Sequence, residues 1–275
     1  MSSLKKWVWP AVYGVGITAL LIAALAYIVQ QKPMTAYVLP TPLLAQLNEE
    51  RAERLRELRA ATVFVYADIP DKRLYDDPTT PDAFRDGRSF GTGVVISPEG
   101  DMLTAEHVVR GMCMPEEQIT IEEVYCAVVM TGHTQVYRAK LLKLDAEDDL
   151  AHLRIIPKEK DERFTLVPVI DVSFDAKLEG REVLVNGIPL GSANMAVLGI
   201  VSNAVDNDEV CKGGKIRATL AVAPGNSGGA LLDVGTGAVV GITSTVRTLG
   251  EGHSAALFLN ITCAASAKQI RSFIE

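Results

Sequence analysis

The chain has 275 residues, 48% of them hydrophobic, and a formal net charge of −7 at pH 7. Its length fits one large domain or two small ones, and an acidic balance without a long basic block argues against nucleic acid as a partner. The four cysteines form neither a Cys-x-x-Cys pair nor a Cys/His cluster at zinc spacing, so the sequence predicts no metal site and no cofactor.

Residues 1–32 are predicted to be a short cytoplasmic tip followed by a transmembrane signal-anchor. Lys5 and Lys6 precede the segment Trp7–Gln31, which carries no charge, and about 20 apolar residues span a bilayer as a helix. The positive-inside rule keeps the N-terminus in the cytoplasm and exports the rest to the periplasm or exterior. The competing interpretation is a cleaved signal peptide, because Ala24-Leu25-Ala26 matches a cleavage site. Both interpretations place the remaining chain where disulfides form.

Residues 33–61 are predicted to be a spacer that contains a helix over Leu43–Ala61. Leucines recur along this stretch at helical spacing: Leu44, Leu47, Leu55 and Leu58. The two interpretations are a charged stalk that packs one face on the following domain and a short coiled coil. The stripe covers fewer than three heptads, which favours the stalk.

The pattern of residues 62–275 indicates one mainly β domain. Short β-branched and aromatic runs alternate with turns rich in Gly and Pro, which is typical of a sandwich or barrel. The predicted strands are Thr62–Tyr66, Phe90–Ser97, Asp101–Ala105, Ile119–Val129, Gln135–Asp145, Leu150–Ile155, Glu182–Asn186, Ala196–Asn203, Lys215–Val222, Ala230–Leu232, Ala238–Thr245 and Ala256–Ile261. Ile69–Ser89 is predicted to be a long loop, and within this domain a helix is predicted only at the end, Ser266–Ile274.

One serine stands in a setting that suits a nucleophile. Ser227 lies in Pro224-Gly225-Asn226-Ser227-Gly228-Gly229, just before an apolar run. Glycine-rich backbone bends sharply and exposes N–H groups, which an oxyanion in a transition state requires. A plain glycine turn between two strands is the alternative interpretation of this stretch.

A serine nucleophile needs a base and a group that orients the base. His107 directly follows a predicted strand–turn–strand unit, which is a rigid mount for a base. His152 is predicted within a strand, on its solvent face, and His133 and His253 in loops. Among the acidic residues at 145–149, Asp149 enters an apolar strand and is the candidate for burial, whereas the others fit a solvated turn.

These motifs together resemble the trypsin-like (chymotrypsin-fold) serine proteases of the HtrA/Deg type. The resemblance covers roughly residues 60–274, and its candidate triad follows the order His, Asp, Ser of that fold. The motifs that carry it are Gly91–Ser97 with Leu103–Val109, Asp149–Leu153, Val185–Gly191 with Gly199–Ser202, and Pro224–Gly229 with Val239–Ile242. The sequence ends soon after the last predicted strand, so we expect a member without a PDZ domain.

The resemblance implies two six-stranded β-barrels with the active site between them, followed by a C-terminal helix. His107, Asp149 and Ser227 would form the catalytic triad, and the backbone N–H groups of Gly225 and Ser227 the oxyanion hole. Asn226 departs from the Asp that digestive enzymes place there to pair with a processed N-terminus, so activation by such cleavage is not expected.

The resemblance also implies a substrate pocket, but it does not fix the oligomeric state. The pocket residues would be Ala221, Val222, Thr243, Ser244 and Thr245. Because none of them is acidic, a small or aliphatic substrate side chain is expected rather than Lys or Arg. Relatives of this type are often trimers, which allows a homo-oligomer here without predicting one.

The cysteines allow a partial assignment. A Cys113–Cys126 bridge would close a short loop near His107 and contribute about 3 kcal/mol. Cys211 and Cys263 are then a second pair or two free thiols.

The favoured function is a membrane-anchored serine endopeptidase that acts on exported proteins or peptides. One alternative is a latent or catalytically silent protease-fold module that binds partner proteins. Another alternative is an esterase that uses the same three residues, which the protease-like order of the motifs disfavours.

Overall fold

The computed structural model describes residues 41–67, 90–114, 124–132, 135–165, 178–189, 194–204, 211, 216–249 and 257–275. The predicted anchor, the Ile69–Ser89 loop, His133 and His253 lie outside these residues. Among the helices within them, none is both long and apolar enough to cross a bilayer. By its contacts the chain divides after Asn48, and the architecture below concerns residues 49–275.

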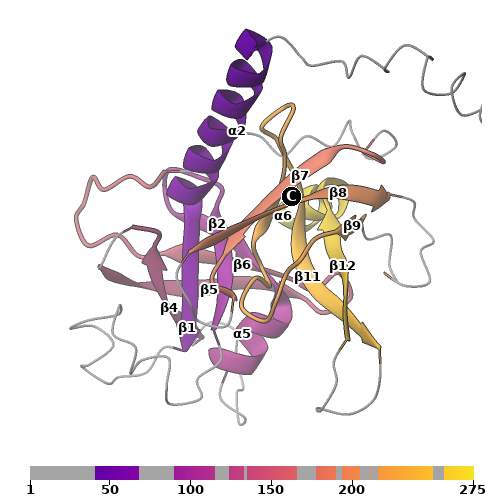
Figure 1. Ribbon diagram of the computed structural model, residues 1–275. Coiled ribbons are helices and arrows are strands. Elements are labelled where there is room, and N and C mark those ends of the chain that lie inside the picture. Colours follow the sequence, from indigo (N-terminus) through magenta and orange to yellow (C-terminus); the bar gives the residue numbers. More distant parts are fainter. Residues whose placement is uncertain are drawn as a thin grey trace, which may run out of the picture. The chain divides into compact units, whose positions relative to one another are not determined.

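The first half of this unit is a closed six-stranded antiparallel barrel with the strand order β1-β2-β3-β6-β5-β4 (Figure 1). Every neighbouring pair is antiparallel, and a bulge in β5 lies between Leu141 and Lys143. The strands are β1 (Thr62–Ala67), β2 (Phe90–Val95), β3 (Asp101–Thr104), β4 (Tyr125–Met130), β5 (Val136–Asp145) and β6 (Leu150–Ile155).

The second half is another closed six-stranded barrel, with the order β10-β11-β12-β9-β8-β7. Its strands are β7 (Glu182–Gly187), β8 (Met195–Asn203), β9 (Ile216–Thr219), β10 (Ala230–Asp233), β11 (Val239–Leu249) and β12 (Leu257–Ser266). Helix α6 (Ala267–Ile274) follows and begins with a capping box between Ser266 and Gln269. The predicted mainly β, two-barrel, chymotrypsin-like class with a C-terminal helix is therefore confirmed.

Alternation along single strands divides the buried side chains between the inside of a barrel and a cluster shared by both barrels. Val95 of β2 and Met102 of β3 point into the first barrel, whereas their neighbours Val94 and Leu103 point into a cluster between the barrels. In β7, Leu184 joins that same cluster. Side chains on a strand alternate between its two faces, so strands buried on both faces appear in the sequence as unbroken apolar runs.

Helix α2 (Thr41–Ala61) closes one side of the cluster between the barrels. Leu58 and Ala61 are fully buried there, and Leu55 is partly buried. The exposed Arg51 forms an ion pair with Glu182 of β7 at 2.8 Å, and such exposed pairs add little stability. The last turns of the helix thus pack on the domain.

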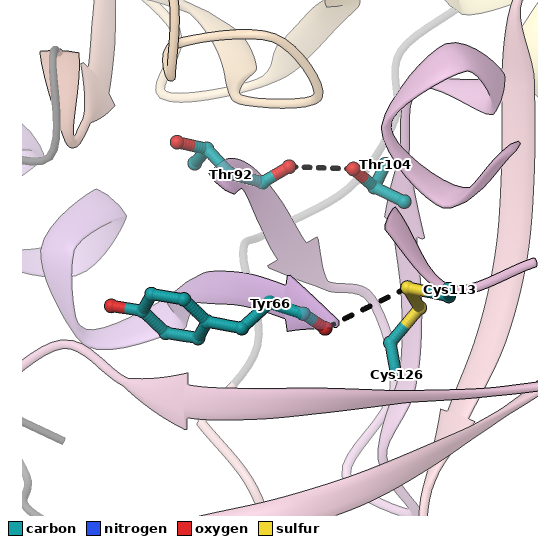
Figure 2. Close-up of a disulfide and its surroundings, with 5 residues drawn as sticks. All are labelled: Tyr66, Thr92, Thr104, Cys113 and Cys126. Carbon is teal, nitrogen blue, oxygen red and sulfur yellow. Dashed lines mark hydrogen bonds between the residues drawn. A yellow bond between two sulfur atoms is a disulfide. The ribbon is translucent and has the colours of Figure 1, made fainter. Parts of the chain in front are cut away.

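Two disulfides link segments that are distant in sequence. Cys113, directly after helix α5 (Glu106–Met112), is bonded to Cys126 of β4 (Figure 2). The Cys113 sulfur lies 3.6 Å from the backbone carbonyl oxygen of Tyr66. The second disulfide joins Cys211 to Cys263 of β12, and all four cysteines are buried.

The two disulfides are expected to differ in their contribution to stability. They close loops of 13 and 52 residues, for which loop-closure entropy predicts about 3 and about 4 kcal/mol. We expect the Cys211→Ala/Cys263→Ala variant to lose more unfolding free energy than the Cys113→Ala/Cys126→Ala variant, as measured by urea unfolding. Alanine in both variants keeps the loss of buried sulfur comparable, and the opposite order would contradict the loop-closure account.

Candidate active site

The base candidate, His107, lies in the first turn of α5, a helix that the sequence analysis did not predict. Strand β3 ends at Thr104, and Ala105 takes an extended conformation before the helix begins. Val108 and Val109 then pack in the core of the first barrel. The helix was missed because it is short and its β-branched valines favour a strand by propensity. It holds His107 at the barrel surface, with a side chain 45% exposed.

Asp149 is held by a tight turn that precedes β6. The Asp145 carboxylate accepts the backbone N–H groups of Glu147 at 2.9 Å and Asp148 at 3.1 Å. Asp149 itself has φ +54°, the only positive φ of a non-glycine residue in the described ranges. Such backbone costs about 1–3 kcal/mol and concentrates at functional sites.

The Asp149 carboxylate binds two groups of His107, the imidazole ring and the backbone N–H. The imidazole Nδ1 lies 2.9 Å from Oδ2 and 3.0 Å from Oδ1, and the His107 backbone N–H donates to Oδ1 at 2.9 Å. Because an ionised carboxylate only accepts hydrogen bonds, Nδ1 carries the proton. In the neutral ring Nε2 is then the acceptor, which is the state that a general base requires.

Ser244 of β11 completes the surroundings of this carboxylate. Its hydroxyl donates to Asp149 Oδ2. Burial by itself raises the pKa of Asp149, but the hydrogen bonds from His107 and Ser244 outweigh burial, and the pKa lies below its usual value. The carboxylate is therefore ionised at neutral pH.

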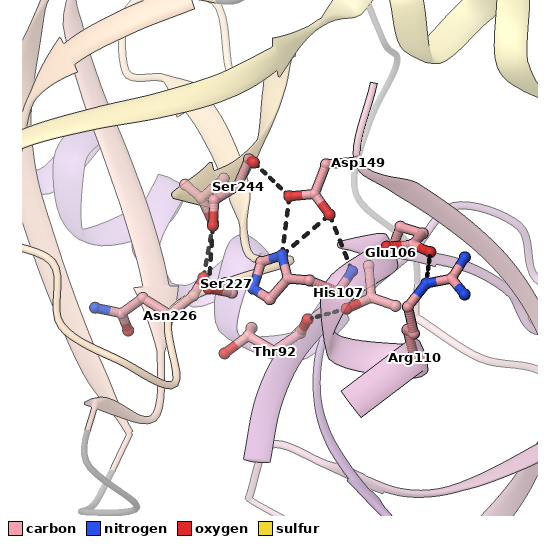
Figure 3. Close-up of polar contacts among 10 residues, drawn as sticks. Thr92, Glu106, His107, Arg110, Asp149, Asn226, Ser227 and Ser244 are labelled. Carbon is pink, nitrogen blue, oxygen red and sulfur yellow. Dashed lines mark hydrogen bonds and ion pairs between the residues drawn. The ribbon is translucent and has the colours of Figure 1, made fainter. Parts of the chain in front are cut away.

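Ser227 projects from a loop of two tight turns before β10. The Asn226 N–H donates to the Ala223 carbonyl at 3.1 Å, and the Gly229 N–H donates to the Asn226 carbonyl at 3.0 Å. The Ser227 hydroxyl donates to the backbone carbonyl of Ser244 at 3.1 Å. Figure 3 shows the His107 ring between Asp149 and Ser227, so the structure brings these three predicted residues together.

Backbone donors lie beside the Ser227 hydroxyl. Within the described residues, the N–H groups of Gly225 and Ser227 have no hydrogen-bond acceptor. Gly225 has φ +103° and is buried. These two N–H groups are thus available to a negatively charged oxygen, which is the chemistry of an oxyanion hole.

Asn226 is buried beside the candidate nucleophile. It is 2% exposed, and no atom of the described residues forms a hydrogen bond with its side-chain amide. An unpaired buried amide costs far less than an unpaired buried carboxylate. A neutral residue therefore suits this buried position better than the carboxylate of an Asp would.

Three of the five predicted pocket residues make contacts inside the protein. Val222 is buried in the core of the second barrel. The Thr243 hydroxyl donates to the carbonyls of Asn226 and Gly229, and the Ser244 hydroxyl to Asp149. Thr243 therefore supports the loop, Ser244 supports the carboxylate, and Val222 belongs to the barrel core. Ala221 is exposed, and the side chain of Thr245 lies outside those described, so a pocket lined by them stays a prediction.

His152 is engaged elsewhere. Its Nε2 lies 3.0 Å from the Asp101 carboxylate, which also accepts hydrogen bonds from Arg154 and Ser97. The sequence analysis placed His152 on the solvent face of its strand. It lies on the same face of β6 as the exposed Arg154, and its side chain is 18% exposed.

Two barrels that hold a His–Asp pair on one and a serine with free backbone donors on the other define the arrangement of chymotrypsin-like serine hydrolases. In agreement with this, the trypsin-like peptidase domain family matches residues 91–242, more than half of the chain. The chain belongs to the trypsin-like peptidase domain family.

The similar proteins are serine proteases of the DegP/HtrA type. The chain is 29% identical over 194 residues to the probable periplasmic serine endoprotease DegP-like of Pseudomonas putida, which covers 68% of this chain and 36% of that protein. It is 28% identical over 231 residues to the magnetosome formation protease MamE of Paramagnetospirillum magneticum, with coverage of 79% and 29%. The chain thus spans about a third of the length of these relatives, and the resemblance from its motifs is confirmed.

A solved structure shares the fold. The crystal structure of the serine endoprotease from Yersinia pestis matches with a TM-score of 0.55 at 21% identity, over 82% of this chain and 65% of that one. At this identity the likeness concerns the two-barrel fold.

Gly228 is expected to tolerate no side chain. It has φ +87°, and a Cβ there would lie 2.1 Å from both the Thr92 carbonyl oxygen and the Thr104 hydroxyl. Gly180 has a similar φ of +81° but open space around it. We expect Gly180→Ala to cost about 1–2 kcal/mol for its backbone alone and Gly228→Ala about 1–3 kcal/mol more, as measured by urea unfolding. Equal losses in the two variants would contradict the close contact.

The hydrogen bonds to Asp149 are expected to make stability depend on pH. Since the folded-state pKa lies below the ordinary value of 3.8, the ionised group stabilises the fold above that pH, and this stability is lost as the pH falls through the folded-state pKa. We expect the difference in unfolding free energy between the native chain and Asp149→Asn to be constant from pH 5 to 8 and to shrink below about pH 4. A difference that persists unchanged to pH 2.5 would contradict these bonds.

Proposed function

We propose that the chain is a serine endopeptidase with Ser227 as nucleophile, His107 as general base and Asp149 as the group that orients His107. The supporting observation is the imidazole held through Nδ1 by the carboxylate and lying next to the serine (Figure 3). This arrangement leaves Nε2 facing the reaction as an acceptor.

In the proposed reaction the Ser227 oxygen attacks the scissile carbonyl while His107 Nε2 takes its proton. The N–H groups of Gly225 and Ser227 stabilise the negative oxygen of the tetrahedral intermediate, and removal of one such donor typically costs about 10²–10³ in rate. The protonated imidazole then gives its proton to the leaving amine. Water, activated by the same imidazole, finally releases the acyl group from Ser227.

The Ser227 hydroxyl has to leave the Ser244 carbonyl before it can donate to His107. Side-chain rotation of this kind is fast for exposed groups, and catalytic hydrogen bonds are often incomplete without substrate. The same observation also supports the second candidate function, a latent or silent module in which the hydroxyl stays on the Ser244 carbonyl.

The substrates are proposed to be exported proteins or peptides. Two buried disulfides suit an oxidising compartment, and a relative is named as periplasmic. The uncharged segment Trp7–Gln31 would anchor the chain, with its N-terminus in the cytoplasm and the protease domain in the periplasm. A small or aliphatic residue would precede the cleaved bond, because no acidic group occurs among the predicted pocket residues.

A fluorophosphonate that reacts with activated serines tests the endopeptidase function. We expect the full-length chain, in mild detergent, to be labelled at Ser227, and the label to be absent from Ser227→Ala. Asp149→Asn should lower the labelling rate by about 10³–10⁴-fold, because there is then no carboxylate that keeps the proton of His107 on Nδ1 and leaves Nε2 free to accept. Folded, unlabelled native chain would contradict the active enzyme and favour the silent module.

A further inference from the structure

Thr92 of β2 joins the first barrel to the loop that carries Ser227. Its hydroxyl donates to the Gly225 carbonyl at 2.7 Å, and its backbone N–H donates to the Ser227 carbonyl at 2.9 Å. Its own carbonyl accepts the Thr104 hydroxyl at 2.6 Å, a bond drawn in Figure 2. Thr92 is fully buried, so water does not compete for these bonds.

One carbonyl that Thr92 binds, that of Gly225, lies between the two proposed oxyanion donors along the chain, and the other, that of Ser227, follows them. The peptide unit from Gly225 to Asn226 lies between the N–H of Gly225 and the N–H of Ser227 along the chain. Because each peptide unit is planar, rotation about the single bonds on either side of this unit moves its carbonyl. Unless the two rotations cancel, they also change the relative direction of the two donors. A bond that holds the Gly225 carbonyl therefore restrains the oxyanion hole as a whole.

Gly225 needs such an external restraint. It has φ +103° and no Cβ, so its own conformational preferences restrict the two flanking dihedrals only weakly. Among the described residues, the Thr92 hydroxyl is the hydrogen-bond donor recorded at the Gly225 carbonyl. Without it the buried carbonyl would be unpaired, which favours rotation toward another donor.

Thr92 is itself rigidly placed. It pairs with Phe64 of β1 within the barrel, and Thr104 of β3 holds its carbonyl. Gly187 and Gly228 approach it closely from the second barrel, where a Cβ would lie 2.9 Å from the Thr92 hydroxyl oxygen and 2.1 Å from its carbonyl oxygen, respectively.

We propose that Thr92 is a positioning residue for the oxyanion hole, acting from the first barrel through its hydroxyl bond to the Gly225 carbonyl. This inference rests on the proposed endopeptidase function and adds a residue that does not touch the substrate. It implies that the oxyanion donors of the second barrel keep their direction only while both barrels are in contact.

Thr92→Val tests the proposal, because it removes the hydroxyl and keeps the shape of the side chain. Thr62→Val is the matched control: Thr62 is also a buried threonine of the first barrel, 1% exposed, and its hydroxyl also donates to one backbone carbonyl, that of Leu58, at 2.7 Å. Thr92→Ser keeps the hydroxyl. All three variants are made in the full-length chain.

The first readout is peptide hydrolysis. We expect Thr92→Val to lower kcat about 10-fold or more, which is below the loss of an oxyanion donor itself, with KM changed less than about twofold. Thr92→Ser should recover most of kcat, and Thr62→Val should leave it within about twofold of the native chain. If Thr92→Val and Thr62→Val have the same kcat, the proposal is overturned.

The second readout is hydrogen exchange, which does not depend on activity. We expect amides of residues 223–229 to exchange at least about 10-fold faster in Thr92→Val than in Thr62→Val, at matched global stability. Equal exchange in the two variants would also overturn the proposal. If the native chain neither hydrolyses peptides nor reacts with the fluorophosphonate, but exchange still rises in Thr92→Val, the endopeptidase function fails and the positioning of the loop by Thr92 stands.

Discussion

The contact between the two barrels is the constraint on which the rest of the site depends. His107 and Asp149 belong to the first barrel and Ser227 to the second, so none of the proposed chemistry exists within one barrel. The apolar cluster of Leu58, Val94, Leu103, Leu184 and their neighbours holds the barrels together without directional bonds. Apolar contact supplies most of the association energy but little angular precision. That precision comes from short polar contacts between the two barrels.

Two of these polar contacts involve backbone groups of the loop around Ser227, where Thr92 binds two carbonyls from the first barrel. Within the second barrel, the Thr243 hydroxyl of β11 holds two other carbonyls of the same loop. The absence of a side chain at Gly228 lets the loop approach Thr92 and Thr104. A loop with several glycines loses much conformational entropy when it becomes ordered. The hydrogen bonds that hold the loop from two sides offset that cost.

Ser244 connects the carboxylate and the serine through two different groups. Its hydroxyl donates to Asp149, and its carbonyl accepts the Ser227 hydroxyl. A displacement of β11 would therefore change the surroundings of both residues together. The bond to Asp149 also lowers the cost of a largely buried carboxylate, since buried charges need hydrogen-bond partners.

Local patterns in the sequence predict the class of fold, the helix before β1, most strand positions and the candidate residues His107, Asp149 and Ser227. These follow from local signals: period-two apolar patterns, turn residues and a serine among glycines. The remaining features depend on contacts between distant segments, which appear only in the folded chain. A short helix carries His107 because its valines are buried, and Ser244 supports Asp149 although its position suggested a substrate pocket. Thr92 lies in an unremarkable Gly-Thr-Gly strand, and it meets Gly225 only because two closed barrels bring residues 133 positions apart within hydrogen-bond distance.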